Sequence, residues 1–135
     1  MTYRVDQSST VSPSRQLVEA VLDGVAAGSI RPGDKLLSVR ALAAEALVNP
    51  NTAARAYRDL EQMGVVEGRN GRGVFVTHDG PQIARAARTT ATLDAYKRAV
   101  AEALRAGHPA DALRKIIESQ MESLDGQSVQ EVGNE

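Results

Sequence analysis

Apolar residues recur every three to four positions in three stretches of the first half of the chain. The spacing predicts three amphipathic helices, at residues 13–28, 38–46 and 50–63. The first and third begin with a capping residue followed by proline, Ser12-Pro13 and Asn49-Pro50, and Ser38 can cap the second. Gly28 and Gly64 suit the ends of the first and third helices.

A two-stranded hairpin is predicted directly after the third helix. Val65-Val66-Glu67 and Val74-Phe75-Val76 are β-rich runs, and Asn70-Gly71 between them suits a tight turn with positive φ. Leu36-Leu37, before the second helix, suits a short edge strand. Three helices followed by a hairpin form a winged helix-turn-helix, whose third helix is shaped to enter the major groove of DNA.

The second half of the chain predicts two more helices. Residues 82–106 and 110–124 carry apolar residues at helical spacing, with a turn at Gly107-His108-Pro109. Residues 1–11 and 125–135 are polar and lack periodicity, so we expect both ends to be flexible. The fold class is therefore mainly α with a small β-hairpin. The domains expected are a winged helix-turn-helix at residues 12–78 and a helical dimerisation region at residues 81–124.

The helical region has more apolar surface than two helices can bury against each other. Pairing with the same hairpin of a second chain would give a small helical bundle, which predicts a homodimer. The alternative is that both helices pack back on their own DNA-binding domain. The expected dimer interface consists of apolar residues from both helices: Leu93, Tyr96, Val100, Leu104, Leu113, Ile116, Ile117 and Met121.

Composition argues against several other classes of protein. The 135 residues include no Cys and two His, so we expect no disulfide, no metal site and no cofactor. His78 and His108 have no nucleophile, carboxylate pair or phosphate loop beside them, which argues against an enzyme. No signal peptide and no apolar run long enough to span a membrane are found. A soluble, cytoplasmic protein is expected.

The net charge of −1 is unlike the basic charge of most nucleic-acid-binding domains. Charge is uneven along the chain, however. Between residues 82 and 115 there are seven basic and three acidic residues, and residues 118–135 carry five acidic and no basic ones. The acidic end therefore offsets a mildly basic middle. A winged helix that binds a protein and has no sequence-specific contact with DNA remains the alternative.

The third predicted helix has an outer face with the chemistry of base recognition. At ~100° per residue, Asn51, Arg55, Arg58 and Gln62 gather opposite the apolar side. Arg can pair with guanine through two hydrogen bonds, and Asn or Gln can pair with adenine in the same way. A solvated charged face is the ordinary interpretation of such a stripe. The hairpin that follows the helix favours DNA binding.

The tip of the predicted hairpin combines charge with little side-chain bulk. Arg69 and Arg72 flank it, and Gly68, Gly71 and Gly73 leave its backbone open to a phosphate or a minor groove. By itself this feature is a weak signal, because many hairpins carry Arg at the tip for solubility. Directly after a compact three-helix unit it indicates a DNA-binding wing.

Several segments of the first half resemble the DNA-binding domain of the GntR family of bacterial transcription regulators. They are IRPGDKL at residues 30–36, SVRALA at 38–43, VNPNT at 48–52, AYRDLE at 56–61 and GRGVFV at 71–76. The similarity covers residues 12–77, about half of the chain. The VNPNT and AYRDLE elements resemble the YtrA-type subfamily, whose relatives have a short two-helix tail.

The resemblance implies DNA contacts for three of these regions. Arg40 contacts the phosphate backbone, residues 49–55 face the major groove, and residues 71–73 reach the minor groove. Pro50 and Ala54 stand where many relatives outside this subfamily carry Arg. Leu37 and Leu47 replace the usual Pro and a frequent Gly. The DNA-binding residues expected are Ser38, Arg40, Asn49, Asn51, Thr52, Arg55, Arg58, Arg69, Gly71, Arg72 and Gly73.

The expected function is sequence-specific regulation of transcription. The protein would act as a homodimeric repressor on a palindromic operator in double-stranded DNA. The YtrA-type resemblance suggests genes for an ATP-driven transporter as targets and leaves room for a small-molecule effector of unknown identity. Salt-sensitive DNA binding would separate this function from the protein-interaction alternative.

Overall fold

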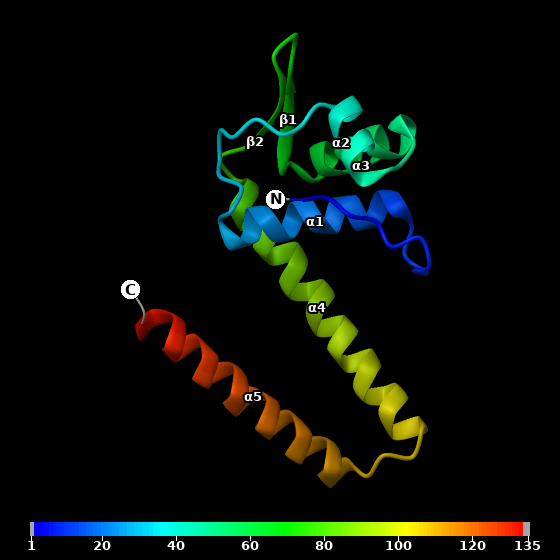
Figure 1. Cartoon of the computed structure of the whole chain (residues 1–135), viewed down its shortest axis with the longest axis vertical. Coiled ribbons are helices and arrows are strands. Elements are labelled where there is room, and N and C mark those ends of the chain that lie inside the picture. The colour runs from blue at the N-terminus through cyan, green and yellow to red at the C-terminus, as the bar shows by residue number, and fades with distance from the viewer. Residues whose placement is uncertain (1, 134–135) are drawn as a thin grey trace. The chain divides into compact units, whose positions relative to one another are not determined.

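The computed structural model describes residues 2–133, with side chains described for residues 2–126. The chain divides into two compact units, one ending at Ala91 and one beginning at Thr92. The elements follow one another as drawn in Figure 1: α1 (Pro13–Ala27), α2 (Val39–Ala46), α3 (Pro50–Met63), β1 (Val66–Arg69), β2 (Gly73–Val76), α4 (Gly80–Arg105) and α5 (Ala110–Gly133). The predicted fold class, mainly helical with one β-hairpin, is confirmed.

Side-chain caps define where the first three helices begin. The hydroxyls of Ser12 and Ser38 and the side-chain carbonyl of Asn49 each accept a hydrogen bond from a backbone amide two or three residues further on, at 3.3, 3.1 and 2.8 Å. Each cap satisfies an amide that a helix leaves without a partner in its first turn. Gly28 and Gly64 end α1 and α3 with left-handed φ values of 84° and 87°. The predicted bounds of these helices are confirmed.

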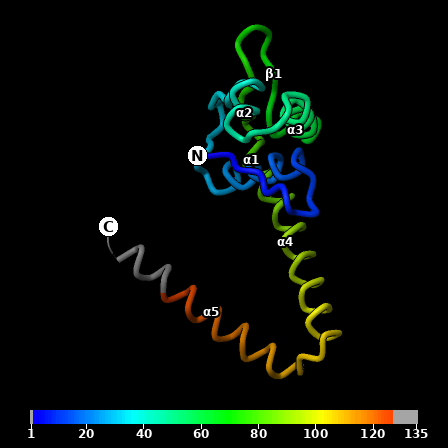
Figure 2. The backbone as a smooth tube through the Cα atoms, turned by 45° about the vertical axis from the view of Figure 1, so that its right-hand side comes forward, coloured from blue at the N-terminus to red at the C-terminus, as the bar shows by residue number. Residues whose placement is uncertain are grey.

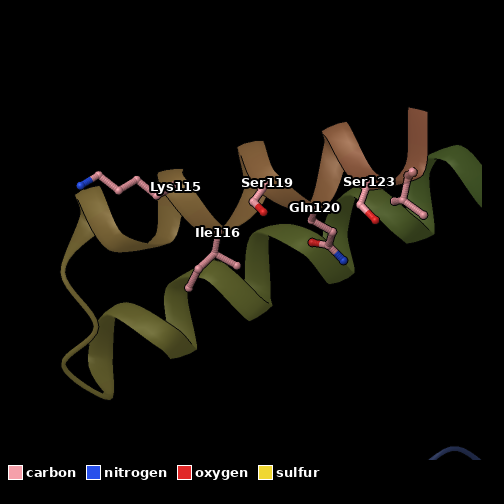
Figure 3. A pocket seen from close by; sticks show the side chains of 6 residues that line it. Lys115, Ile116, Ser119, Gln120 and Ser123 are labelled. Carbon is pink, nitrogen blue, oxygen red and sulfur yellow. The ribbon is translucent and has the colours of Figure 1, made fainter. Parts of the chain in front are cut away.

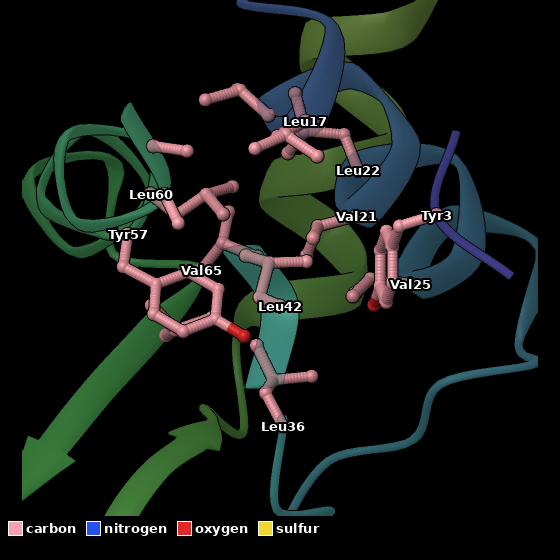
Figure 4. Packing of buried hydrophobic residues seen from close by; sticks show 14 of the residues in the cluster. Tyr3, Leu17, Val21, Leu22, Val25, Leu36, Leu42, Tyr57, Leu60 and Val65 are labelled. Carbon is pink, nitrogen blue, oxygen red and sulfur yellow. The ribbon is translucent and has the colours of Figure 1, made fainter. Parts of the chain in front are cut away.

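The core of the first unit is aliphatic and lies among α1, α2 and α3 (Figure 4). Leu42 of α2 and Leu60 of α3 have no exposed surface. Ala53 and Ala56 are equally buried, and their small side chains let α3 lie close to its neighbours. The largest share comes from one face of α1: Leu17, Val18, Val21, Leu22 and Val25. Full burial of one such side chain is worth about 1.5–3 kcal/mol, so the first unit has a stabilising core of its own.

The wing is an antiparallel hairpin in which Arg69 of β1 lies opposite Gly73 of β2. The amide of Arg72 donates to the carbonyl of Arg69 over 3.0 Å, which closes the turn. Gly71, inside this turn, has a φ of 70°. The predicted position of the turn is therefore correct, and the Gly supplies the backbone conformation that side chains disfavour there.

A short segment before α2 continues the wing on the free side of β2. Lys35 pairs with Phe75, and the amide of Leu36 donates to the carbonyl of Val74 over 2.8 Å. The edge strand expected at Leu36-Leu37 is therefore a single bridge one residue earlier. Through this bridge the segment that leads into α2 is joined to the wing.

The segment before α1 is packed, where the sequence predicts a flexible one. Tyr3 is only 5% exposed and belongs to the core. Burial raises the pKa of the Tyr3 phenol, and the negative charge of Glu45 raises it further. The side-chain amide of Gln16 on α1 donates to the carbonyls of Asp6 and Val11 at 3.0 and 2.8 Å. One aromatic residue among polar ones has no periodicity, so the pattern could not indicate its burial.

The first unit also extends beyond the boundary expected at residue 78. α4 begins at Gly80, where a Cβ atom would lie 2.9 Å from the carbonyl oxygen of Val65. Ala84 has no exposed surface, and Arg88 forms an ion pair with Asp23 of α1. The first turns of α4 therefore complete the core of the winged helix-turn-helix.

The second unit consists of the rest of α4 and α5, joined by a turn in which Gly107 has a φ of 101° (Figure 2). No described side chain from Thr92 to Gly126 is buried. The predicted end of the last helix near Leu124 is wrong, because α5 continues to Gly133. The stretch contains no proline that would stop a helix. Residues 1, 134 and 135, also expected to be flexible, lie outside the described residues.

Candidate nucleic-acid interface

The outer face of α3 is the surface best suited to read bases. Its opposite face is buried, so the helix is held in place and Asn51, Arg55, Arg58 and Gln62 are left exposed. Thr52 is half-buried at the edge of this face. The structure therefore brings together the amides and guanidinium groups that the sequence places on one side of the helix, in the arrangement that can pair with base edges.

The two arginines of this face are available for a ligand. Asp59 and Glu61 lie close to them in the sequence and could pair with them. Within the described residues neither Arg55 nor Arg58 forms an ion pair. Glu61 instead accepts a hydrogen bond from the amide of Gly68 in β1, at 3.1 Å. Both guanidinium groups therefore keep their donors available for a ligand.

The start of α2 is anchored to α3 through a buried tyrosine. The phenol of Tyr57 donates to the carbonyl of Leu37 over 2.6 Å. Burial raises the pKa of Tyr57, with the nearby Tyr3 adding to the shift, so the phenol stays protonated and able to donate. Arg40, in the first turn of α2, is exposed and has no ion pair in the described part of the chain. The contact fixes this cation relative to the outer face of α3.

The two arginines of the wing have different environments. The guanidinium of Arg69 bonds to Glu67 at 3.0 and 3.2 Å and lies over the ring of Phe75, 4.4 Å from its centroid. Arg72 is exposed at the tip and forms no ion pair among the described residues. Both arginines were expected to contact DNA. Arg72 is available for such a contact, whereas Arg69 is engaged within the hairpin. Gly71 and Gly73 beside Arg72 are exposed, as expected.

Sequence reasoning missed Lys35. Its side chain lies along the backbone of Gly73, where a Cβ atom would come within 2.8 Å of the lysine Cε. No ion pair of Lys35 is found in the described part of the chain. The contact adds a cation to the wing next to Arg72. It joins segments far apart in the sequence, so local spacing held no signal for it.

Two of the expected DNA-binding residues act first within the protein. The side-chain oxygens of Ser38 and Asn49 accept helix amides as caps. Both residues are exposed and stand at helix N-termini, where the backbone amides and the helix dipole favour a phosphate. Their side chains therefore cap the starts of α2 and α3, and both helix ends remain exposed.

Apolar side chains remain uncovered on the second unit. Three of the eight predicted interface residues, Leu93, Ile116 and Met121, are 49%, 60% and 57% exposed. The other five line an open groove of about 270 Å³ between α4 and α5: Tyr96, Val100, Leu104, Leu113 and Ile117. A second open groove, of about 600 Å³, runs along α5 beside Ile116 and Leu124 (Figure 3). Both helices thus present apolar surface to solvent.

Other site chemistry is sparse in the described part of the chain. No group of three or more His, Asp or Glu side chains comes together there in a way that could hold a metal ion. His78 and His108 are both exposed. None of the helices described has the length and apolar character needed to cross a membrane.

Comparison with known proteins agrees with this geometry. Residues 13–76 match the model of the family described as bacterial regulatory proteins, gntR family. The HTH-type transcriptional repressor YtrA of Bacillus subtilis (strain 168) is 30% identical over 114 residues, which cover 84% of this chain and 88% of that protein. The chain belongs to the GntR family. Membership of this family, predicted from five short segments of the sequence, is confirmed, as is the similarity to YtrA.

Two further relatives support membership of the GntR family. The HTH-type transcriptional regulator Rv1152 of Mycobacterium tuberculosis (strain ATCC 25618 / H37Rv) is 44% identical over 78 residues, 58% of this chain and 64% of that regulator. A solved GntR family transcriptional regulator from Listeria monocytogenes superposes with a TM-score of 0.71 at 26% identity, over 85% of this chain and 98% of the other. The chain is thus a GntR-family transcription regulator with a winged-helix DNA-binding domain.

The turn between α2 and α3 departs from the GntR pattern in one visible way. Leu47, at a position where Gly is frequent, has a left-handed φ of 56° and is 85% exposed. A side chain in this conformation costs roughly 1–2 kcal/mol. In this GntR domain the turn keeps its geometry although the residue disfavours it, because the helices on both sides are packed and capped.

Proposed function

We propose that this GntR-family regulator is a homodimeric repressor that binds a palindromic operator in double-stranded DNA. The observation that carries the proposal is the outer face of α3. There Arg55 and Arg58, which form no ion pair with any described residue, lie between the exposed amides of Asn51 and Gln62. In each half-site α3 enters the major groove, and Arg55 pairs with a base edge. Asn51 and Thr52, in its first turn, face the same groove.

Around this helix the remaining contacts position the protein on the phosphate backbone. Arg40 and the capped start of α2 meet the phosphates, and the wing reaches the minor groove with Arg72 and the bare backbone of Gly71 and Gly73. Arg69 supports the wing through Glu67 and Phe75. Contacts of this kind fix register and contribute affinity, whereas base contacts supply specificity.

The second unit is the proposed dimer interface. Its apolar side chains, including Leu93, Ile116 and Met121, are about half exposed or more in one chain, and such uncovered surface marks an interaction site. A second copy of the same two helices offers a matching apolar surface, and a two-fold interface uses every residue twice. Two linked DNA-binding domains on one palindrome also bind far more tightly than a single domain.

Repression is the proposed sign of regulation, because a dimer bound over a promoter blocks polymerase and the relative from B. subtilis is named a repressor. Genes for an ATP-driven transporter are the proposed targets, a step that rests on the resemblance to YtrA alone. The regulator would act in the cytoplasm, where a small-molecule effector of unidentified chemistry would release it from its operator.

Selection of operators from random DNA, followed by fluorescence anisotropy over a range of salt concentrations, tests DNA binding. We expect an enriched palindrome, tight binding to it and a steep loss of affinity with salt, at a slope of about 0.9 per neutralised phosphate. No enrichment of any sequence, with no salt-dependent binding, would favour the protein-interaction alternative, to which the net charge of −1 gives some support.

Sedimentation at micromolar concentration tests the dimer. The parent chain should be a dimer, and Ile116→Asp should release monomers, because one Asp enters the interface in each copy and about 3–6 kcal/mol of apolar burial is lost over the two. Ile116→Val keeps an apolar side chain and should remain dimeric. A monomeric parent, with no change on adding the selected palindrome, would rule out this architecture.

A further inference from the structure

The wing is tied to the recognition helix by one side chain. An Oε atom of Glu61, near the end of α3, accepts the hydrogen bond of the Gly68 amide at 3.1 Å. Gly68 lies opposite Val74 in the hairpin, and its amide points away from β2 because its hydrogen bond goes to α3. The bond therefore reaches the outer edge of β1, midway between the base of the wing and its tip.

Glu61 is an unexpected residue for a surface that faces DNA. At ~100° per residue, it lies roughly 90° to one side of the centre of the outer face of α3, and Asp59 lies roughly 70° to the other side. Both carboxylates therefore flank Arg55 and Arg58, where phosphates would approach. A carboxylate there repels phosphate, and by charge alone it weakens binding.

The two carboxylates differ in what they contact. Glu61 bonds to the wing, whereas no hydrogen bond or ion pair of Asp59 occurs in the described part of the chain. A hydrogen bond with an ionised acceptor is stronger than a neutral one. A Cβ atom at position 68 would lie 3.5 Å from the Glu61 oxygen, an ordinary contact, so the bond does not depend on glycine there. Glu61 is thus placed to restrain the angle between α3 and the hairpin.

We propose that Glu61 is a positioning residue for operator binding: it holds the wing at the angle from which Arg72 reaches the minor groove while α3 occupies the major groove. The inference rests on the proposed function. It assigns the Glu61 side chain two opposing effects on affinity. The charge repels phosphate, and the hydrogen bond presents Arg72. The bond outweighs the charge, because it links the middle of β1 directly to α3, on the edge of the hairpin opposite the Lys35–Phe75 bridge.

Neutral variants of Glu61 separate the two effects, because loss of the charge should raise operator affinity and loss of the hydrogen bond should lower it. Glu61→Gln removes the charge and keeps a carbonyl oxygen at the same place, so operator affinity should be unchanged or rise a few-fold. Glu61→Ala removes the charge and the acceptor, and affinity should fall about two- to tenfold, the change expected for one net hydrogen bond. Asp59→Ala, the matched control on the opposite flank, should leave affinity unchanged or raise it.

A double-mutant cycle identifies what Glu61 acts through. The loss caused by Glu61→Ala should largely vanish in the Arg72→Ala background, because the wing has then lost the exposed arginine that it presents. It should persist in the Arg55→Ala background. In the parent and in Glu61→Gln, the Gly68 amide should exchange slowly with solvent hydrogen, and in Glu61→Ala it should exchange faster, as NMR spectroscopy of the free protein can measure.

The same titrations distinguish failure of this inference from failure of the proposed function. A parent chain with no salt-dependent binding to selected DNA overturns the proposed function and the inference with it. A parent chain that binds well, with Glu61→Ala as tight as Glu61→Gln or with equal losses in the Arg72→Ala and Arg55→Ala backgrounds, overturns only the positioning role. A fall in affinity confined to Glu61→Ala and absent once Arg72 is removed supports it.

Discussion

The two units of the chain bury their apolar residues very differently. In the first unit, side chains such as Leu42, Leu60 and Val65 have no exposed surface. In the second, every described side chain from Thr92 to Gly126 keeps some exposure, and Ile116 is 60% exposed. Two helices are too few to enclose a core, whereas three helices and a hairpin suffice. The first unit can therefore fold by itself, and in the proposed dimer the second gains its stability from another copy.

Removal of the second unit should have the largest effect. A fragment ending at Ala91 keeps Ala84 and the Arg88–Asp23 ion pair, so it should fold, remain monomeric and retain its α3 contacts. Its affinity for a palindrome should fall about 100-fold or more, because the second half-site is no longer bound by a linked partner. Its affinity for a single half-site should match that of one subunit of the parent.

Circular dichroism, sedimentation and anisotropy measure these properties. A shorter fragment ending at Thr77 serves as the control, since it lacks the turns of α4 that complete the core and should unfold at a lower temperature. If the monomeric fragment ending at Ala91 bound the palindrome as tightly as the parent does, the second unit would not be what joins the two DNA-binding domains.

Truncation of one leucine in each unit sharpens the contrast. Leu42→Ala in the first unit should lower the free energy of unfolding by about 2–5 kcal/mol, the usual cost of a cavity at a fully buried leucine. This loss should not depend on protein concentration. Leu104→Ala in the second unit should cost more when measured at high concentration than at low, because its side chain is 47% exposed until a partner covers it.

Urea unfolding at several protein concentrations measures both losses. A Leu104→Ala loss that stays the same over a hundredfold range of concentration would place this residue in an intramolecular core and contradict the difference between the units.

Changes at the DNA-binding surface should alter affinity and leave the oligomeric state alone. Arg55→Ala should cost about 1–3 kcal/mol on the preferred operator and relax sequence preference at the contacted position. Arg72→Ala should weaken binding to a similar extent whichever bases α3 contacts, and it should flatten the salt dependence of binding. Arg15→Ala, on α1, where it pairs with Glu19, removes a cation of the same kind away from this surface and is the control.

Anisotropy with the selected operator and a scrambled one separates base contacts from phosphate contacts. Parent-like binding by both the Arg55 and Arg72 variants would mean that another surface meets DNA.

The smallest effect is expected in the turn before α3. Leu47→Gly should stabilise the first unit by roughly 0.5–1 kcal/mol, since relief of the left-handed strain is partly offset by the greater freedom of Gly in the unfolded chain. Ala44→Gly, on the exposed side of α2, should instead destabilise it by about 1 kcal/mol. Thermal unfolding compares the two variants. If Leu47→Gly lowered the free energy of unfolding as much as Ala44→Gly does, Leu47 would make a stabilising contact.

Local signals in the sequence were sufficient for most of the fold. The bounds of α1, α2 and α3 follow from Ser, Asn, Pro and Gly at their ends, whose effects act within a few residues. The burial of Tyr3 and the contact of Lys35 with Gly73 depend on distant segments meeting in space, and no local pattern contains them. The same is true of α4, whose first turns join the core through Ala84.

The candidate site was predictable to a similar degree. The outer face of α3 follows from helical periodicity, which is why its arginines and amides were found. The ion pair of Arg69 could have been predicted from the sequence, since Glu67 lies two residues away and therefore on the same face of the strand. The contact of Glu61 with Gly68 had none, because it depends on how the hairpin folds back against the helix.

The position of Phe75 limits how the wing can treat DNA. This is the chain's one phenylalanine, and it lies half-buried under the guanidinium of Arg69, away from the tip, where Asn70, Gly71 and Arg72 are all polar or bare. Proteins that kink DNA from the minor groove insert an apolar wedge between base pairs. The tip offers no such wedge, so in the proposed complex it leaves base stacking intact. An arginine without a wedge responds to the width of the groove and its negative potential, which favours narrow A·T-rich flanks.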